Sequence, residues 1–257
     1  MKATLTVLGS GTSMGVPTLG CACKVCISTD PHDSRTRPSV LIEYDRRVVL
    51  IDTTPDFRTQ AIREKISRLD AVLYTHAHAD HIMGLDDVRP LSFRGEKKIP
   101  LYAHEATLKQ IESAFRYVFE PDPDYTTLPR VELCRMNGSL ELFGACFQPI
   151  PLMHGKAEIH GFRFGSAAYL TDFSDIPDAS MNALGGLDIL FLDALRHRPH
   201  PTHSNVENSL KLVERLNPRR AFFTHISHDL GHAETNATLP PHVRLAHDGL
   251  KLEFEIA

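Results

Sequence analysis

Four side chains of the kinds that bind metal ions lie within six residues of the chain, at His76, His78, Asp80 and His81. The mostly apolar run at residues 70–74 predicts a β-strand, and the alternation of an extended chain places the first two imidazoles on one side. Imidazoles and carboxylates crowded together without a cation are costly to desolvate and repel one another when charged. Two adjacent metal ions would satisfy all four groups, so the sequence predicts a dinuclear metal site.

The other ligands of such a site have to come from elsewhere in the chain. Three candidates each follow a short apolar run: His154, Asp172 and His225. Singly, each is better explained as an ordinary polar residue at the end of a strand. As a set behind the histidine cluster they point to one preformed site, because strand ends hold side chains on a rigid scaffold.

Three cysteines, Cys21, Cys23 and Cys26, also lie within six residues of one another. This spacing suits one tetrahedral zinc ion that lacks a fourth ligand. His228 is the candidate for that ligand, because it lies three residues after His225. The alternative is a loop with free, reduced thiols. We predict a structural zinc site on a loop at about residues 20–38.

The composition is that of an ordinary globular protein, with 42% apolar and 23% charged residues among 257. The net charge of −4 gives no general attraction to nucleic acid or to anionic membranes, so we expect neither as a partner. An anionic substrate must then be held by a local site. The N-terminal apolar stretch is too short for a secretory signal, and the cysteines do not form a disulfide pattern. We therefore expect a cytoplasmic protein.

The predicted elements alternate between strands and covering helices, and no repeat or change in composition marks a domain boundary. Such an order favours sheet packed on sheet with helices outside. We expect strands at residues 2–8, 39–44, 47–52, 70–75, 99–103, 187–192 and 220–224, and helices after Pro55, from Ile82, at 105–117 and at 206–216. The loops at 93–98 and 119–128 are expected to shape the substrate pocket.

These residues resemble the metallo-β-lactamase superfamily, whose signature His-x-His-x-Asp-His is matched by His76 to His81. The resemblance implies one α/β domain over residues 1–257 with the four-layer αββα fold, in which two mixed β-sheets are sandwiched between helices. It also implies the role of each ligand. His76, His78 and His154 would hold one metal, Asp80, His81 and His225 the other, Asp172 would bridge them, and Asp52 would orient the site from behind.

The cysteine cluster beside a dinuclear site resembles one branch of that superfamily. It is the branch of the cyclic-phosphate phosphodiesterase of bacterial phosphonate breakdown and its uncharacterised relatives. The segments Leu8–Ser13, Thr54–Arg58 and Thr224–His228 also match this branch. The relative in pyrroloquinoline-quinone biosynthesis shares the cysteines but typically lacks the complete histidine signature. The resemblance also implies a homodimer.

Residues 196–205 form a loop rich in histidine, arginine and proline between a predicted strand and a predicted helix. In the phosphodiesterase branch a histidine of this loop acts on the phosphate. His203 matches it best because it lies just before the helix, and His200 is the alternative. The simpler interpretation is that Ser204 or Asn205 caps the helix and that the histidines are solvated.

We therefore predict a dinuclear-metal-dependent hydrolase, a phosphodiesterase that acts on small cyclic phosphodiesters or nucleotides through a metal-bridging hydroxide. Its catalytic residues would be His203 and Asp80. The dinuclear ligands suit zinc or manganese, and also iron or nickel, while sulfur ligands favour zinc at the cysteines. The alternatives are a hydrolase of thioesters or lactones from the same superfamily, and a non-catalytic sensor of metals or metabolites.

Overall fold

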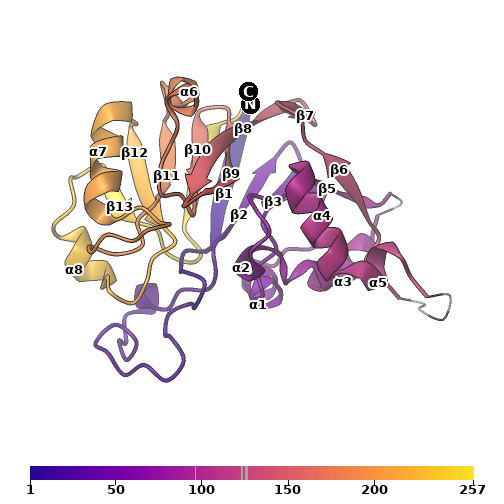
Figure 1. The fold of residues 1–257 in the computed structure, drawn as a ribbon, viewed down its shortest axis with the longest axis horizontal. Helices are drawn as coiled ribbons and strands as arrows, with labels where there is room; N and C mark the ends of the chain where they lie inside the picture. The colour runs from indigo at the N-terminus through magenta and orange to yellow at the C-terminus, as the bar shows by residue number, and fades with distance from the viewer. Residues whose placement is uncertain (96, 123, 125–126) are drawn as a thin grey trace.

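The structure, a computed structural model, describes residues 1–95, 97–122, 124 and 127–257. Over these residues the chain forms two mixed β-sheets of seven strands each, which pack face to face with helices on both outer faces (Figure 1). This arrangement confirms the predicted αββα fold. Residues 96, 123 and 125–126, which belong to the two loops expected to shape the pocket, lie outside the described residues.

The first sheet combines an antiparallel edge with a parallel half. β14, β1, β2 and β3 pair antiparallel, and β3 to β6 pair parallel. In spatial order its strands are β14 (Lys251–Glu255), β1 (Lys2–Gly9), β2 (Ser39–Tyr44), β3 (Arg47–Ile51), β4 (Ala71–Leu73), β5 (Ile99–Ala103) and β6 (Val131–Arg135). The connection from β1 to β2, residues 10–38, is called the clip loop below.

The second sheet mirrors this plan. β13 to β10 pair parallel, whereas β10, β9, β8 and β7 pair antiparallel. Its spatial order is β13 (Val243–Leu245), β12 (Arg220–Thr224), β11 (Ile189–Asp193), β10 (Ala167–Leu170), β9 (Ala157–Phe164), β8 (Ala145–His154) and β7 (Leu140–Leu142).

The central strands are apolar throughout because both of their faces are buried. In β11, Ile189 and Phe191 pack between the sheets, while Leu190 and Leu192 pack under the helices. Alternate residues of a strand point to opposite faces, so a continuous apolar run fills two layers of core. The other sheet repeats the pattern, with Ile51 in the core between the sheets and its neighbour Leu50 under the helices of that side.

Helices cover the outer face of each sheet (Figure 1). The longest, α7, begins after Asn205, whose side chain accepts a hydrogen bond from the amide of Asn208, as the capping interpretation predicts. The helices on the first sheet are α1 (Phe57–Arg63), α2 (Ala79–Ile82), α3 (Arg89–Ser92), α4 (Glu105–Ala114) and α5 (Arg116–Phe119); those on the second are α6 (Asp178–Met181), α7 (Val206–Leu216) and α8 (His232–Asn236). Within the described ranges, no helix is both long and apolar enough to cross a membrane.

The helix after the histidine cluster begins earlier than predicted. α2 starts at Ala79 rather than Ile82, and β4 ends at Leu73. His78 precedes the helix in an extended conformation, and its carbonyl accepts a hydrogen bond from the amide of His81 at 2.9 Å. The tight first turn therefore includes Asp80 and His81, and it turns their side chains back toward the strand ends.

Candidate metal centre

The candidate ligands meet at one edge of the two sheets, where the parallel strands of both end. Asp52 directly follows β3, and His225 directly follows β12. Asp172 comes two residues after β10, and His154 is the last residue of β8. The carboxyl ends of parallel strands meet at a common edge, which is where α/β sheets carry their ligand sites.

Three of these residues have a backbone conformation that is rare for residues other than glycine. The φ angles are 66° at Asp52, 61° at Asp172 and 57° at His225. Each value lies in the left-handed region, which costs on the order of 1–3 kcal/mol and persists where the surroundings enforce it. The three residues share this sharp turn at the end of a strand, and it directs each side chain into the site.

Asp80, His81, Asp172 and His225 form a buried group whose ligand atoms lie within 4.8 Å of one another. The Nε2 atom of His81 lies 3.3 Å from a carboxylate oxygen of Asp80 and 3.3 Å from one of Asp172. The Nε2 atom of His225 lies 3.0 Å from Asp172 and 3.7 Å from Asp80. The structure thus brings together the residues assigned to one metal, with Asp172 among them.

Asp52 holds this group in place from behind. Its carboxylate is completely buried and accepts hydrogen bonds from the amide and the hydroxyl of Thr75, both at 2.8 Å. Its second contact is with Nδ1 of His81, also at 2.8 Å. A carboxylate on one ring nitrogen fixes the orientation of the imidazole and leaves the other nitrogen for a metal.

His76, His78 and His154 form a second group next to the first. The ring centre of His76 lies 4.6 Å from that of His78 and 5.7 Å from that of His154, and the last two are 5.1 Å apart. The Nδ1 atom of His154 lies 2.8 Å from the carbonyl of Thr202 and donates to it, so its Nε2 is free to act as a ligand. The ring centres of His76 and His81 are 4.1 Å apart, so the two groups are in contact.

The electrostatics of the buried group favour a cation at its centre. Burial opposes a positive charge on His81 and His225, but the surrounding carboxylates outweigh it. They raise the pKa of His81 well above its usual value and that of His225 to about 9. Burial also opposes the charge on Asp80 and Asp172, and the nearby imidazoles hold both pKa values well below their usual range.

Unpartnered ring nitrogens test whether the residues fit metal ions. Among the described residues, the Nε2 atoms of His76, His81 and His225 are buried and make no hydrogen bond. A buried polar atom without a partner is costly, and native proteins rarely leave one so. Imidazole nitrogens and carboxylate oxygens are common ligands of divalent metals. The donor set therefore fits the two metal ions that the sequence predicts.

His203 lies beside both groups, packed between two of the candidate ligands. Its ring stacks on that of His225 at 4.6 Å and 13° and lies 4.8 Å from that of His154. Its Nδ1 atom is 2.8 Å from Asp193, whose carboxylate is fully buried. Burial and the neighbouring His225 lower the pKa of His203 to about 4. His200 lies 5.0 Å from His203.

Asp193 is a site residue that the sequence interpretation missed. It is the last residue of β11, and one of its oxygens lies 3.9 Å from Nδ1 of His225 in addition to its contact with His203. Its signal was an acidic residue after an apolar run, the same one that identified Asp172.

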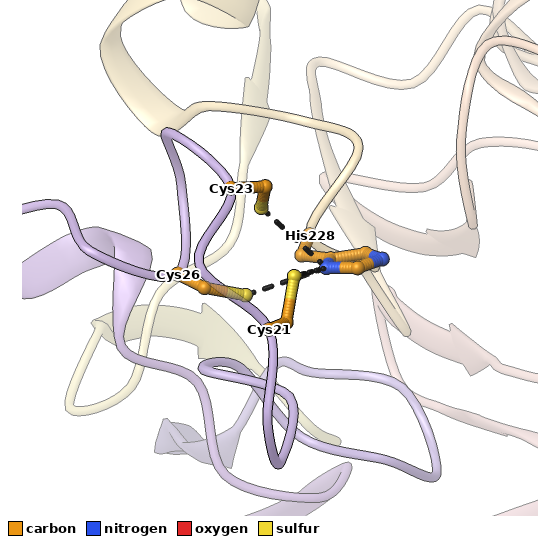
Figure 2. A group of neighbouring side chains, drawn as sticks. All are labelled: Cys21, Cys23, Cys26 and His228. Atoms are coloured by element: carbon orange, nitrogen blue, oxygen red, sulfur yellow. Dashed lines mark hydrogen bonds between the residues drawn. The ribbon is translucent and has the colours of Figure 1, made fainter.

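The three cysteines of the clip loop converge on His228, which comes from the other end of the chain (Figure 2). Its Nδ1 atom lies 3.3 Å from the sulfur of Cys21, 3.6 Å from that of Cys23 and 3.3 Å from that of Cys26. A tetrahedral zinc ion with bonds of about 2.3 Å to sulfur and about 2.0 Å to nitrogen implies S···N separations of about 3.5 Å. The sulfur–nitrogen distances of these four side chains, the zinc clip, therefore match those of one tetrahedral zinc site.

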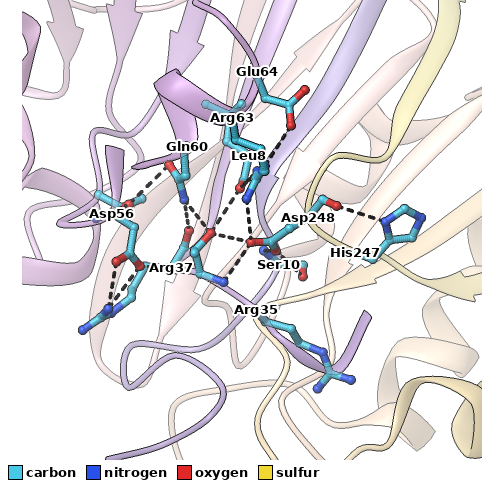
Figure 3. Close-up of polar contacts among 12 residues, drawn as sticks. Leu8, Ser10, Arg35, Arg37, Asp56, Gln60, Arg63, Glu64, His247 and Asp248 are labelled. Atoms are coloured by element: carbon cyan, nitrogen blue, oxygen red, sulfur yellow. Dashed lines mark hydrogen bonds and ion pairs between the residues drawn. The ribbon is translucent and has the colours of Figure 1, made fainter. Parts of the chain in front are cut away.

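Asp248 fastens both ends of the clip loop (Figure 3). Its carboxylate accepts hydrogen bonds from the amide and hydroxyl of Ser10, both at 2.9 Å, and from those of Thr36, at 2.9 and 2.5 Å. Arg63 of α1 adds an ion pair at 3.2 Å. A single, partly exposed carboxylate thus joins the two ends of a loop that is otherwise without long regular elements.

Three histidines pack together at the base of the clip loop and give a prediction for acid stability. The ring centre of His32 lies 4.6 Å from that of His232 and 4.3 Å from that of His247. Burial, with the neighbouring His32, Arg35 and His247, lowers the pKa of His232 to about 4, and Asp30 opposes this only weakly.

In the unfolded chain His232 takes up its proton near its ordinary pKa of 6.5, whereas the folded protein resists protonation down to about pH 4. The free energy of unfolding should therefore fall as the pH drops from about 6.5 to 4. Because the ring is partly exposed, we expect a contribution of about 1 kcal/mol. Thermal melts of the unchanged protein and of His232→Asn across this range test it. Parallel melting curves would contradict the prediction.

Comparisons with known proteins agree with this geometry. The model of a family described as the beta-lactamase superfamily domain matches residues 47–226. The chain therefore belongs to the beta-lactamase superfamily. A solved structure described as a new diphosphatase from the PhnP family is 62% identical, covers 100% of this chain and 98% of that chain, and superposes with a TM-score of 0.95. Within the superfamily, the chain is thus a member of the PhnP family.

Two further relatives are less similar in sequence, and one of them is a longer protein. An octanoyltransferase of Porphyromonas gingivalis is 39% identical over 250 residues, which are 95% of this chain and 50% of that protein. The chain thus spans about half the length of this curated relative. Zn²⁺-bound PqqB from Methylobacterium extorquens is 20% identical, covers 97% of this chain and 99% of that chain, and has a TM-score of 0.78. This last likeness is one of fold.

Proposed function

We propose that the protein is a hydrolase with a dinuclear metal centre that cleaves small phosphodiesters or diphosphate esters. One observation carries the proposal. Seven imidazoles and carboxylates from strand ends, from the segment after β4 and from the first turn of α2 meet in two adjacent groups, and buried Nε2 atoms in both groups make no hydrogen bond. Such a donor set is the arrangement that two divalent ions require, and two-metal sites are common among enzymes that cleave phosphate esters.

The assignment of ligands follows the two groups. His76, His78 and His154 would hold the first ion, and Asp80, His81 and His225 the second, with Asp172 between them. Divalent ions held there would neutralise phosphate charge and make water more acidic. The protein orients the ligands, and Asp52 fixes the orientation of one of them, His81, by its contact with Nδ1 of that ring.

His203 would bind the phosphate of the substrate. Asp193 accepts the hydrogen on Nδ1 of this ring at 2.8 Å, which leaves Nε2 for an anionic group. The side chain is 13% exposed, so a ligand at the metal centre can reach it. A phosphate beside the imidazole favours its protonated form, from which Nε2 can donate a proton to the leaving oxygen.

The choice of substrate class draws on the chemistry and on the 62% identical relative, which is described as a diphosphatase. Phosphodiesters and diphosphate esters share a phosphorus bonded to two substituted oxygens, of which one leaves. They also share negative charge, which a protein of net charge −4 can attract only locally. Small cyclic phosphodiesters and nucleotides, the substrates predicted from the sequence, belong to this class.

A second candidate is hydrolysis of a thioester. The Porphyromonas gingivalis relative is called an octanoyltransferase, a name that points to chemistry at an acyl carbonyl carbon. Half of that protein lies outside the match. The same site could polarise a carbonyl group instead of a phosphate, so a thioester belongs among the test substrates.

A substrate panel tests the proposal. Protein loaded with zinc or manganese would be assayed with bis-p-nitrophenyl phosphate, a 2′,3′-cyclic nucleotide, a nucleoside diphosphate ester, an octanoyl thioester and a lactone. We expect turnover of phosphate substrates that a chelator abolishes and added metal restores. Turnover of the thioester or lactone alone would favour the second candidate. No turnover at full metal occupancy would refute both and favour a sensor.

The homodimer, the cytoplasmic location, the single domain over residues 1–257 and the identity of each metal remain predictions. Native mass spectrometry of the purified protein would give the oligomeric state and the metal content in one measurement. We expect three metal ions per chain, two in the metal centre and one zinc in the zinc clip.

A further inference from the structure

The short segment Thr224–His228 carries ligands of both candidate metal sites. His225 belongs to the metal centre, and His228 belongs to the zinc clip. We propose that Arg35 is a positioning residue for the metal centre. It ties this segment to the clip loop and thereby couples the zinc clip to the orientation of His225. The inference rests on the metal centre of the proposed function.

The backbone at His225 needs support from its surroundings. Its φ of 57° lies in the left-handed region, and a residue other than glycine keeps such a conformation only where neighbouring contacts enforce it. The next residue, Ile226, is held from both sides by the start of the clip loop. Its amide donates to the carbonyl of Ser10 at 2.9 Å, and its carbonyl accepts from the amide of Thr12 at 3.1 Å.

Arg35 supplies the second half of this support. Its side chain is completely buried, and its guanidinium donates to the carbonyls of Ser227 at 3.0 Å and Leu230 at 2.7 Å. On its own loop it donates to the carbonyl of His32 at 3.2 Å and to the carboxylate of Asp33 at 3.0 Å. The planar fork of arginine thus spans from the clip loop to both sides of His228, which a lysine could not do.

The clip loop is itself anchored, so it can serve as a frame. Asp248 joins its two ends through Ser10, which Figure 3 labels, and through Thr36. The zinc clip closes its outer part onto His228. The segment Thr224–His228 is therefore fixed by Ser10 and Thr12 at Ile226, by Arg35 at Ser227, and by the zinc clip at its end.

This arrangement predicts a selective effect on the metal centre. His225 is grouped with Asp80 and His81, whereas His76, His78 and His154 come from other elements. Loosening the segment should weaken the second metal and leave the first unchanged. A general loss of folding would weaken both.

Stepwise titration of the metal-free protein with Co²⁺ tests the inference. The thiolate charge-transfer band reports the zinc clip, and the weaker bands of histidine and carboxylate ligation report the metal centre. For Arg35→Lys and Arg35→Met we expect the thiolate band to persist, the first centre metal to bind as before, and the second to bind about 10–100-fold more weakly. Arg37→Met is the matched control, because Arg37 ties the same loop to Asp56, at the start of α1.

Binding of both centre metals as tightly as in the unchanged protein would overturn the inference, and so would equal weakening of the two in folded protein. If circular dichroism shows that Arg35→Met does not fold, Cys26→Ser makes the test from the clip side. It removes the clip metal and should also weaken the second centre metal, and unchanged affinity would overturn the inference. A protein that binds all the metals but hydrolyses nothing would refute only the proposed function.

Discussion

Replacement of Asp172 by alanine is expected to abolish metal binding at the second position, weaken it at the first, and lower turnover by about 10⁴-fold or more. The carboxylate is buried and lies 3.3 Å from Nε2 of His81 and 3.0 Å from Nε2 of His225. Removing it leaves these imidazoles facing a cavity. A loss of about 10⁴ in rate corresponds to ~5 kcal/mol of transition-state stabilisation, which is reasonable for a group that would contact both ions.

Elemental analysis and the substrate panel measure this effect together. Asp172→Asn keeps the shape of the side chain and removes its charge, so it should retain the fold and still bind less metal. Asp175→Ala is the matched control, because Asp175 is an exposed carboxylate three residues further along. An Asp172→Ala protein that keeps two metals in the centre and more than a tenth of the activity would contradict the assignment.

His203→Ala should lower turnover about 10²–10⁴-fold without changing the metal content. This loss of turnover is the one expected when a positioned general acid is removed. The ring contacts His225 and His154 but is not needed to complete either group of ligands. Elemental analysis checks the metal content. The rate of the variant is then measured with bis-p-nitrophenyl phosphate, whose leaving group needs little protonation, and with a cyclic nucleotide. The loss should be greater for the cyclic nucleotide.

Two further variants separate His203 from its neighbours. Asp193→Asn keeps the size of the side chain at 2.8 Å from the ring but favours the wrong tautomer, so it should reproduce part of the His203→Ala loss. His200→Ala, in the same loop, should have a small effect. Full activity in His203→Ala, or a larger loss in His200→Ala, would transfer the role to His200.

Much of the site could be predicted from the sequence because its polar residues directly follow apolar runs that form strands. Asp172 and His225 follow apolar runs, and parallel strands bring such positions together, so their convergence was predictable. Asp193 obeys the same rule, because it directly follows the apolar strand predicted at residues 187–192, but it was not among the predicted site residues. The start of α2 was misplaced by three residues, because the polar residues of its first turn gave no apolar periodicity.

Contacts that depend on exact backbone paths were out of reach of the sequence. Arg35 and the carbonyl of Ser227 are separated by 192 residues, and a carbonyl oxygen carries no signature in the amino-acid type. Asp248 is a second example, because Ser10 and Thr36, which it joins, lie 238 and 212 residues away in the sequence. Patterns in the sequence reveal which groups can bind a metal, while the supporting hydrogen bonds emerge only from the fold.

The left-handed turns at Asp52, Asp172 and His225 also bear on how the protein would respond to engineering. At each of them the backbone is strained so that a functional side chain points into the site, and glycine would remove that strain. A laboratory selection for heat resistance alone, with metals withheld, should therefore drift toward glycine or asparagine at Asp172 and His225, whereas Asp52 should be retained because its buried carboxylate accepts the hydrogen bonds of Thr75 and contacts His81. The selected variants would unfold at higher temperature but would no longer bind the metals or catalyse hydrolysis.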